Sequence, residues 1–402
     1  MDIIRILRLI LYNTAIFLCL YLLASCGRSK HEKVEMGNFH TVEVSFDPVA
    51  DYNTFYRPFV RDMDVIPLEN FNGIELGNVM YFKVLDTLIY ILQDNRPIYV
   101  FNTHGKFRRK IGELGEGPGK FEIISDFFIE DSIIYISSYT SVEMFKLDGT
   151  YLGNFNINER YKPPRPLFNF NFFRKDGYIY LFDNGRHGKY HFYTFNEDGQ
   201  LLATKFPNNY LIEAVWSRFI NTEGKVYLLP VNCVDTIFQL NGAEVLPAWY
   251  FDFGSHANRS LDDLPGSMSQ PQDMLNLMQY CAEKKRVFSI SRFDKYKQHL
   301  FFTFGLNNEG YNCYYDTITH ICSTIKYTDP PEIFNPLVNA QGFYINEGKL
   351  YMSVNAFVLK EALESGQNKC SYLSEDRQKQ IMSKLKNIGE LDNPVLFVVD
   401  LK

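Results

Sequence analysis

The sequence predicts an all-β protein: a six-bladed β-propeller of four-stranded antiparallel blades, with two helical insertions. Three observations lead to this fold class. Aromatic residues make up 16% of the 402-residue chain, and aromatic side chains suit the half-buried surfaces of strands. A turn-and-strand motif occurs six times along the chain. A second motif, built on phenylalanine and glycine, alternates with the first, so that each unit carries two hairpins.

The first motif is an acidic or polar turn followed by a strand with an aromatic residue at a fixed place. The six aromatic residues are Tyr90, Tyr135, Tyr180, Tyr227, Phe301 and Tyr351. They are separated by 45, 45, 47, 74 and 50 residues. Four-stranded propeller blades repeat about every 40–50 residues. The spacing therefore predicts six blades, with extra residues inside the fourth interval.

The second motif places a glycine four residues after a phenylalanine. It occurs at Phe101/Gly105, Phe145/Gly149, Phe195/Gly199 and Phe238/Gly242. Asp148-Gly149, Asp198-Gly199 and Asn241-Gly242 are dipeptides typical of two-residue type I′ turns, which need a positive φ at both residues. We therefore expect one hairpin at the first motif, joining strands a and b, and one at the second, joining strands c and d.

The start of the chain is typical of a lipoprotein signal peptide, which we assign to residues 1–25. Arg5 and Arg8 precede an apolar stretch that is too short to span a bilayer comfortably. The sequence Leu-Ala-Ser-Cys-Gly that follows resembles the bacterial lipobox, with Cys26 as the lipidated residue. A plain signal peptide with a chance cysteine is the alternative. Several acyl chains on one cysteine would anchor the protein stably in a membrane.

We interpret residues 26–39 as a polar tether and residues 40–402 as the propeller. Gly27 is not the aspartate that commonly retains lipoproteins at the inner membrane, so the sequence favours the outer membrane. It leaves open whether the propeller faces the periplasm or the outside. The formal net charge is −6, with no dense basic patch, which argues against nucleic acid as a partner because such binding requires many Lys and Arg side chains.

Two insertions are predicted within the repeats. The long fourth interval places one at about residues 255–285, where apolar residues follow helical spacing. The other is expected at about residues 357–389, with Ser374 as a helix cap and Gly389 as its end.

The sixth unit lacks one strand. Residues 394–401 form a last apolar strand, after which the chain ends. Either Thr41–Phe46 or Asp64–Leu68 is expected to supply the missing strand. Closing the ring in this way removes exposed sheet edges.

Four segments of the chain carry a resemblance to a known family. They are Val-Ile-Pro-Leu-Glu at 65–69, Arg-Pro-Ile-Tyr-Val-Phe at 96–101, Gly-Glu-Leu-Gly-Glu-Gly-Pro-Gly-Lys-Phe at 112–121 and Asn-Pro-Val-Leu at 393–396. Together they resemble the six-bladed β-propeller lipoproteins of Gram-negative gut anaerobes, distant relatives of NHL-repeat propellers. The resemblance covers roughly residues 40–402 and implies the fold. It implies no particular activity, because fold does not fix function.

The sequence contains no recognisable catalytic or metal-binding motif. HExxH, GxSxG and EF-hand patterns are absent, and none of the seven cysteines forms a CxxC pair. We therefore name no catalytic residue, no metal ligand and no cofactor. The glycine-rich run at 115–119 lacks the Gly-Lys-Ser/Thr of a phosphate loop and predicts a tight link between blades.

Two polar places are candidate binding sites. Asp183, Arg186 and His187 lie in the most polar loop of the third unit and could present charge to an anionic or sugar ligand. A solvated turn is the alternative. Arg96 begins an expected strand of the first unit. It could face the central channel and bind a carboxylate with two hydrogen bonds, or pair with an acid of a neighbouring blade.

Cys313 and Cys322 flank an expected hairpin whose centre lies between Thr317 and Ile318. In that register the two cysteines would lie opposite each other. A compartment outside the cytoplasm permits a disulfide, although two buried thiols fit the sequence equally well.

These features predict a lipid-anchored cell-envelope propeller that binds a glycan, a peptide or a partner envelope protein. The aromatic content and the lack of a catalytic motif favour such a module over an enzyme. The alternative is a hydrolase or lyase with its site at the propeller axis, since residues from several blades can form a site without a linear motif. A purely structural envelope component is a third hypothesis.

Overall fold

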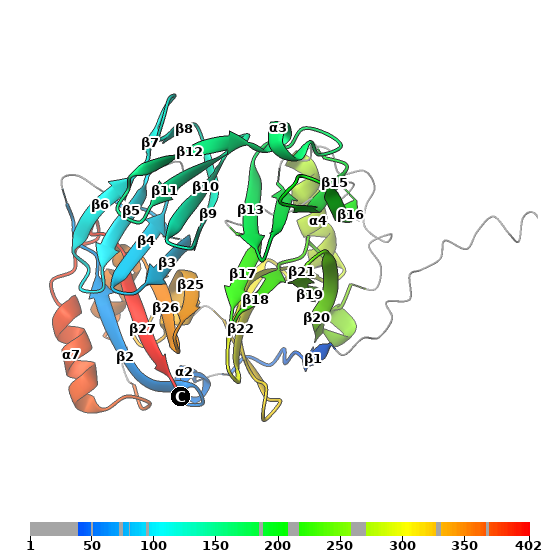
Figure 1. The fold of residues 1–402 in the computed structure, drawn as a ribbon. Coiled ribbons are helices and arrows are strands. Elements are labelled where there is room, and N and C mark those ends of the chain that lie inside the picture. The colour runs from blue at the N-terminus through cyan, green and yellow to red at the C-terminus, as the bar shows by residue number, and fades with distance from the viewer. Residues whose placement is uncertain are drawn as a thin grey trace, which may run out of the picture. The chain divides into compact units, whose positions relative to one another are not determined.

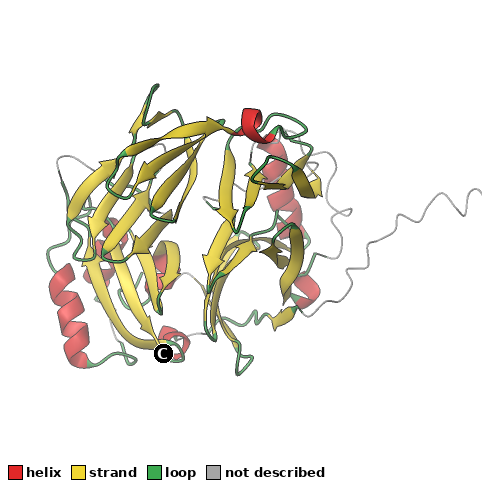
Figure 2. Ribbon diagram, viewed as in Figure 1, coloured by secondary structure: helices red, strands yellow, loops and turns green. Residues whose placement is uncertain are grey.

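A computed structural model describes residues 39–49, 51–71, 75–79, 81–93, 96–184, 188–207, 217–258, 271–326, 331–366 and 370–402. The expected signal peptide, Cys26 and the tether up to residue 38 lie outside the described residues, so the lipid anchor stays a prediction. Residues His40–Lys402 form one compact unit. Within its described part, six antiparallel sheets follow one another around a ring (Figures 1 and 2), which confirms the six-bladed β-propeller.

The first three blades contain their four strands in chain order. Blade 1 consists of β3 (Tyr81–Leu85), β4 (Leu88–Leu92), β5 (Ile98–Asn102) and β6 (Phe107–Ile111). Blade 2 consists of β9 (Ile124–Glu130), β10 (Ile133–Ser138), β11 (Ser141–Lys146) and β12 (Tyr151–Asn156). Blade 3 consists of β13 (Phe170–Lys175), β14 (Tyr178–Asp183), β15 (Tyr190–Asn196) and β16 (Leu201–Pro207). The short strands β7 (Glu113–Leu114) and β8 (Lys120–Phe121) pair with each other in the link between blades 1 and 2.

Blades 4 and 5 also contain four strands in chain order, whereas blade 6 combines three strands from residues 340–401 with β2 from residues 60–67. Blade 4 consists of β17 (Phe219–Thr222), β18 (Lys225–Leu228), β19 (Thr236–Asn241) and β20 (Glu244–Asp252). Blade 5 consists of β21 (Val287–Tyr296), β22 (His299–Leu306), β23 (Glu309–Asp316) and β24 (Cys322–Lys326). Blade 6 consists of β25 (Ala340–Asn346), β26 (Lys349–Val354), β27 (Val395–Leu401) and β2 (Val60–Pro67). First strands of successive blades contact one another, for example β9 with β13 and β3 with β25, so they form the inner ring.

Strand β2 closes the ring by antiparallel pairing with β27, with Val65 opposite Phe397. Of the two segments expected from the sequence, the later one therefore supplies the missing strand. The earlier one forms β1 (His40–Glu43), which adds to blade 4 by parallel pairing with β20. The apolar side chains of Val60, Met63 and Val65 explain the choice, because all three are buried in the core of blade 6.

Helices occur in both predicted insertions. Helix α4 (Pro271–Glu283) lies between blades 4 and 5, and α6 (Ala356–Ser365) and α7 (Glu375–Leu385) lie between β26 and β27. Helix α7 runs along β2 at the outside of blade 6 (Figure 1). Ser374 caps α7 as expected, accepting a hydrogen bond from the Arg377 amide at 3.3 Å. The helix ends at Leu385, before the expected end at Gly389.

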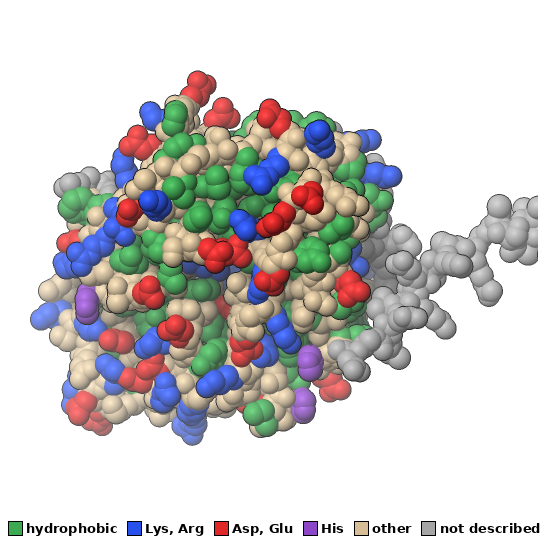
Figure 3. Space-filling model, in the orientation of Figure 1, with side chains coloured by type: hydrophobic (Ala, Val, Ile, Leu, Met, Phe, Trp, Pro, Cys, Tyr) green, Lys and Arg blue, Asp and Glu red, His purple; other side chains and the backbone are tan. Residues whose placement is uncertain are grey.

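Four shorter helical segments complete the secondary structure of the described residues: α2 (Tyr52–Tyr56), α3 (Ile157–Tyr161), α5 (Pro336–Asn339) and the 3₁₀ turn η1 (Gly254–His256). None of the helices in the described ranges is long and apolar enough to cross a bilayer. Acidic and basic side chains are mixed over the face drawn in Figure 3.

Positive φ at both turn residues, as type I′ turns require, occurs at four of the six a–b hairpins, so the expected place of these turns at the c–d hairpins is wrong. Both turn residues have positive φ at Asp131-Ser132, Asp176-Gly177, Glu223-Gly224 and Glu347-Gly348. In the c–d turns of blades 2 and 3 only the glycine has a positive φ, and the strand register shifts beside it. These longer turns use glycine to form a bulge. In blade 4 Asn241 pairs with Glu244, so the turn there is Gly242-Ala243.

Each inner strand carries a phenylalanine four residues before the first residue of its a–b turn. These residues are Phe82, Phe127, Phe172, Phe219, Phe293 and Phe343. The first five are at most 3% exposed, and Phe343 packs at the edge of the blade 6 core. The six side chains place one large apolar group per blade at the same level of the ring. Burial of each contributes about 2 kcal/mol or more to folding.

Candidate functional site: a pocket beside blade 5

The strands are joined by two kinds of link. The a–b and c–d turns are short, whereas the b–c and d–a links, called connections here, contain α3, α4, α5, α6 and α7. Antiparallel pairing places the a–b turn and the b–c connection at opposite ends of a blade. The insertions and the most varied loops therefore start from the same end of the strands, which is where a site specific to this protein would be expected.

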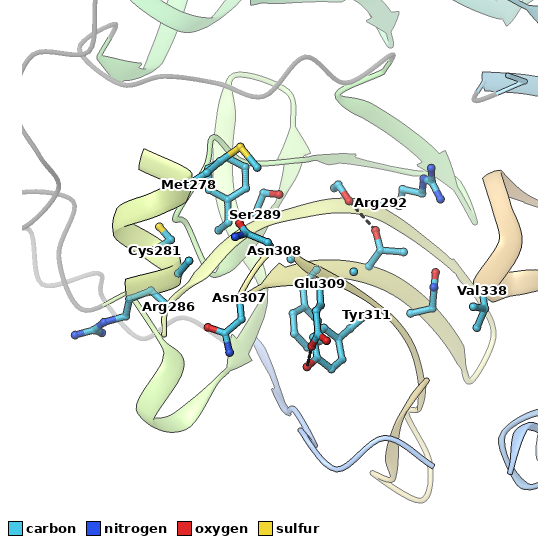
Figure 4. A pocket seen from close by; sticks show the side chains of 18 of the residues that line it. Met278, Cys281, Arg286, Ser289, Arg292, Asn307, Asn308, Glu309, Tyr311 and Val338 are labelled. Atoms are coloured by element: carbon cyan, nitrogen blue, oxygen red, sulfur yellow. Dashed lines mark hydrogen bonds between the residues drawn. The ribbon is translucent and has the colours of Figure 1, made fainter. Parts of the chain in front are cut away.

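A pocket of about 590 Å³ lies at this end of blade 5. Figure 4 shows Met278 and Cys281 of α4 on one side of this blade-5 pocket and Val338 on the other, with the Asn307-Asn308 turn between them. The pocket thus extends from the first insertion across blade 5 to the start of blade 6.

Small residues on neighbouring strands form the floor of the blade-5 pocket. Ser289 pairs with Gly305, which pairs in turn with Gly310 on the next strand. A Cβ atom added at Gly310 would meet nothing within 4 Å, and one added at Gly305 would meet only Phe288, at 4.0 Å. The two glycines therefore leave open space above the sheet. The next rung, Thr303 opposite Asn312, adds a hydroxyl and an amide.

Three asparagines are among the polar residues that line the blade-5 pocket. Asn307 and Asn308 form the b–c turn, both with positive φ, and Asn312 lies on β23. Their side-chain amides make no hydrogen bond to any other residue of the described ranges. Because an amide carries both donors and acceptors, these groups can pair with a polar ligand such as a peptide backbone.

The opposite wall of the blade-5 pocket is apolar and comes from α4. Met274, Met278 and Cys281 are four and three residues apart along the helix, so they share one face. Leu277 and Cys281 are buried against Cys233 of blade 4, which holds the helix in place. Methionine side chains are flexible and polarisable and adapt to ligands of varied shape.

Glu309 is the one carboxylate among the described residues that line this pocket. It accepts hydrogen bonds from Lys326 Nζ at 2.8 Å and from the Tyr311 hydroxyl at 3.1 Å. The Lys326 ammonium, with Tyr311, lowers the pKa of Glu309. The Tyr311 ring stacks on Phe304 with centroids 4.8 Å apart. Glu309 is therefore held as a charged structural partner, and the arrangement suits binding rather than acid–base chemistry.

A second polar cluster lies on the inner ring. The Lys83 ammonium lies 4.3 Å from the ring centroid of Tyr344 and 5.2 Å from that of Tyr81. The Lys83 side chain is half-buried. Burial lowers the pKa of Lys83, and the charges of Asp294 and Asp126 oppose that shift.

The two carboxylates of this axial cluster join different blades. Asp126 of β9 accepts a hydrogen bond from Ser217, next to β17, at 3.1 Å. Asp294 of β21 accepts one from the Ile345 amide of β25 at 2.7 Å. Burial raises the pKa of Asp126 and raises that of Asp294 to about 6. Because both acids already have partners in other blades, the cluster acts as a structural junction of the ring.

The polar loop predicted as a binding site is only partly described. Asp183 is fully buried, and its Oδ2 accepts a hydrogen bond from the Gly188 amide at 2.7 Å. The carboxylate thereby ties together the two ends of the loop and is not exposed to solvent. Arg186 and His187 lie outside the described residues, and their role in binding stays a prediction.

Arg96 lies in the b–c connection of blade 1, because β5 begins only at Ile98. Its expected place in a strand is therefore wrong. Nη1 donates to the Glu75 carbonyl at 3.0 Å. The side chain lines a groove of about 370 Å³ between the connections of blades 1 and 6, with Asn355 and Asp392. No inner-strand residue occurs among the described residues that line this groove, so Arg96 does not face the axis there.

The expected register of Cys313 and Cys322 is off by two residues. Cys313 pairs with Thr324, and Cys322 pairs with Tyr315. The turn is longer on the β24 side. The His320 amide donates to the Asp316 carbonyl, and the Asp316 amide donates to the Ile321 carbonyl. The two cysteines are diagonal neighbours, and both are free thiols in the structure. A different pair is in contact: Cys233 Sγ lies 3.6 Å from Cys281 Sγ.

Comparison with known protein families identifies the family of this chain. Residues 56–400 match the model of a domain of unknown function, DUF4934. The chain belongs to this family. No curated protein matches its sequence.

Solved structures resemble this DUF4934 member to different degrees, and one of them shares its fold. A Bacteroides fragilis protein inferred to be exported has 18% sequence identity and a TM-score of 0.69, over 90% of this chain and 99% of that one. The extracellular domain of an inferred one-component system from B. thetaiotaomicron has 13% identity and a TM-score of 0.37, over 73% and 39% of the two chains. BamB from Moraxella catarrhalis has 9% identity and a TM-score of 0.38, over 72% and 73%.

Sequence reasoning did not find the blade-5 pocket. Its lining residues extend from Met274 to Ala340 and share no short motif. One signal was available, because the Gly305 and Gly310 positions flank an Asn-Asn turn inside an otherwise aromatic hairpin. Two glycines at paired strand positions indicate a close approach of a ligand or another backbone.

Proposed function

We propose that this DUF4934 protein is a lipid-anchored protein of the outer membrane, and that its propeller binds a peptide segment of a partner in the blade-5 pocket. The observation that carries the proposal is the pocket floor. There, paired glycines leave open space beside asparagine amides that have no partner among the described residues. A binding module follows from this geometry more directly than an enzyme, because the one lining carboxylate is already engaged.

A peptide fits the pocket better than a sugar. Sugars are usually held by an aromatic face, but the Tyr311 ring is stacked on Phe304 and also contacts the Lys326 ammonium, 5.3 Å from its centroid. A peptide offers backbone donors and acceptors to asparagine amides and apolar side chains to methionines. The floor of the blade-5 pocket provides the polar contacts, and the α4 wall on the opposite side provides the apolar contacts.

The envelope location rests on the sequence, and the exported relative supports it. The lipobox at Cys26 indicates lipidation, and the Bacteroides fragilis protein with the same fold is inferred to be exported. In cells given a radioactive fatty acid, the wild-type chain should carry label and sediment with the outer membrane. The Cys26→Ser variant should carry none and leave the membrane fraction. A labelled Cys26→Ser protein would contradict anchoring at this residue.

The peptide proposal can be tested on the purified protein. Linear peptides selected from a phage-displayed library would be synthesised and titrated calorimetrically against the wild type and two variants. Gly310→Trp fills the open floor and should abolish binding. Asn312→Ala removes one amide and should weaken binding roughly tenfold, the equivalent of one hydrogen bond.

Leu202→Trp is the matched control for the bulky substitution. Leu202 lies on the outer strand of blade 3 and is 37% exposed, so a tryptophan there should leave the affinity unchanged. Equal binding by Gly310→Trp and the wild type would exclude the blade-5 pocket as the peptide site. Binding of soluble glycans, with no selected peptide that depends on Gly310, would show that the ligand class is wrong.

A further inference from the structure

Two cysteines meet where α4 contacts blade 4. Cys233 lies in the b–c connection of that blade, and Cys281 lies in the last turn of α4. Their sulfur atoms are 3.6 Å apart, and the side chains are 3% and 1% exposed. With Leu277 they form the centre of a small core that Met274, Tyr280 and Phe288 cover. This is the place where the first insertion is fixed to the ring.

The backbone on both sides holds the two sulfurs in position. Cys233 has a φ of 60°, an uncommon conformation for a residue other than glycine. Its amide donates to the Phe288 carbonyl of blade 5 at 2.9 Å. Cys281 is followed by a helix end at which the Arg286 amide returns to the Cys281 carbonyl at 2.7 Å. Backbone hydrogen bonds therefore hold the main chain at both cysteines in place.

We infer that Cys233 and Cys281 form a disulfide bond in the exported protein, and that this bond fixes α4 as the wall of the blade-5 pocket. The inference rests on the proposed envelope location, because disulfides persist in compartments outside the cytoplasm. The sulfurs need to approach from 3.6 Å to about 2.05 Å, which a small rotation of both side chains can provide. The two residues are 48 positions apart, so the bond would close a long loop and constrain the unfolded chain.

The chemistry balances with a disulfide of an envelope thiol oxidase as the oxidant. The thiolate of Cys281 attacks that disulfide and releases one oxidase thiol, which leaves a mixed disulfide. The thiolate of Cys233 then attacks Cys281 Sγ and releases the second oxidase thiol. Two cysteine thiols lose two electrons and two protons, and the oxidant gains both. The exchange takes place during folding, before Leu277 and Phe288 cover the sulfurs.

The other cysteines of the described residues provide an internal control. Cys313 and Cys322 are near each other, but they are diagonal in the sheet, and their sulfurs make no contact of the kind seen at Cys233. Cys370 lies after α6. All five cysteines of the described residues, Cys233 and Cys281 included, are free thiols in the structure, so the comparison between them rests on the distance between their sulfur atoms. Proximity in the sequence would favour the first of these pairs, whereas the geometry selects Cys233 and Cys281.

The inference is tested by mapping thiols in the full-length protein, expressed with its own signal sequence in a Gram-negative host. Cells are quenched in acid, thiols are blocked with N-ethylmaleimide in denaturant, and the protein is digested without reduction. Mass spectrometry should find the Cys233 and Cys281 peptides joined, and should find maleimide on Cys313, Cys322 and Cys370. In the Cys281→Ala variant, Cys233 should carry maleimide.

Maleimide on both Cys233 and Cys281 in protein recovered from the envelope would overturn the disulfide and leave the peptide-binding proposal intact. Recovery of the protein in the cytoplasm would overturn the envelope location and, with it, the disulfide. As a second readout, reductant should lower the Tm of the wild type by several degrees and leave that of the Cys233→Ala/Cys281→Ala double variant unchanged. Equal shifts in the two proteins would also overturn the inference.

Discussion

The turns and the connections of this propeller differ in what fixes their conformation. Each a–b turn has at least one residue with positive φ, and its residues are mostly exposed and polar. The connections bury polar groups instead, among them Asn232, Asp235 and Asn335. Local backbone chemistry therefore determines the turns, whereas contacts between distant segments determine the connections.

The turns determine the architecture that the protein shares with other propellers, and the connections determine the features that are specific to this chain. Turns that recur every blade set strand register and ring geometry, and they would serve any member of the fold. The connections carry the helical insertions, the blade-5 pocket and the cysteine pair. Substitutions in the two classes of link should therefore have different effects on stability, on its pH dependence and on ligand binding.

The largest effect is expected where a turn touches the ring-closing strand. Gly105 in the c–d turn of blade 1 has a φ of +77°, and a Cβ atom there would lie 2.0 Å from the Pro67 carbonyl oxygen at the end of β2. Gly105→Ala should lower the free energy of unfolding by about 3 kcal/mol or more, because backbone must move to relieve the clash. Urea unfolding followed by tryptophan fluorescence measures this change.

Gly177 is the matched control for that substitution. It has a φ of +79°, and a Cβ atom there would meet nothing within 4 Å. Gly177→Ala should cost only the strain of the left-handed backbone, about 1 kcal/mol. Equal losses of unfolding free energy at the two glycines would show that the contact with β2 contributes nothing to stability and that only the left-handed turn conformation matters.

An intermediate effect on stability is expected from the acids. A buried acid in a connection and an exposed acid in a turn should make stability depend on pH in opposite directions. Burial in the b–c connection of blade 4 raises the pKa of Asp235 to about 7, despite hydrogen bonds from Asn258. Its unfolded pKa is about 3.9. Between these values the folded state binds more protons than the unfolded state, so stability falls as the pH rises.

Asp235→Asn removes this titration. The variant should lose less stability than the wild type between pH 5 and pH 8, and at pH 8 should be more stable by roughly 1–3 kcal/mol. Asp148, in the c–d turn of blade 2, should behave in the opposite way, because a hydrogen bond from Thr150 lowers its pKa. Asp148→Asn should therefore lose stability at neutral pH and not in acid. Parallel pH profiles for wild type and Asp235→Asn would contradict the assignment.

The smallest effect is expected at α7, an inserted helix outside the ring. Ser374→Ala removes the hydroxyl that accepts from the Arg377 amide, which should cost about 1 kcal/mol or less. Lys379→Ala on the same helix changes an exposed side chain, 74% accessible, and should stay within about 0.5 kcal/mol of the wild type. A loss at Ser374 as large as that at Gly105 would mean that the insertion is part of the ring's cooperative core.

The fold could be predicted from the sequence because the turns repeat. An a–b turn needs residues that tolerate positive φ, and the chain repeats such residues at one place per blade. The same reasoning misplaced the type I′ turns, since Asp-Gly occurs both in two-residue turns and before glycine bulges. The inner phenylalanines lie at a constant distance before each a–b turn, so they were an equally regular signal. The prediction used the aromatic residues of the following strand instead.

The candidate site could not be predicted, because it depends on pairing between remote segments. Asp126 meets Ser217 across two blades, and Cys233 meets Cys281 through a helix that lies outside the repeat. No spacing along the chain encodes such contacts. The polar loop at Asp183 looked functional because its residues are charged, yet the carboxylate is buried and serves the loop itself. Charge in a sequence indicates a polar group and does not indicate the direction in which it points.

Pairing of β2 with β27 joins residues near the start of the propeller to the last residues of the chain, with Val60 opposite Leu401. During synthesis, β2 emerges early and has no partner strand until β27 follows. A chain that stops before residue 395 would leave two open sheet edges, one on each side of the gap, and such edges invite aggregation. Strand β27 is therefore a condition for closing the ring, so that copies without it are left exposed to proteolysis.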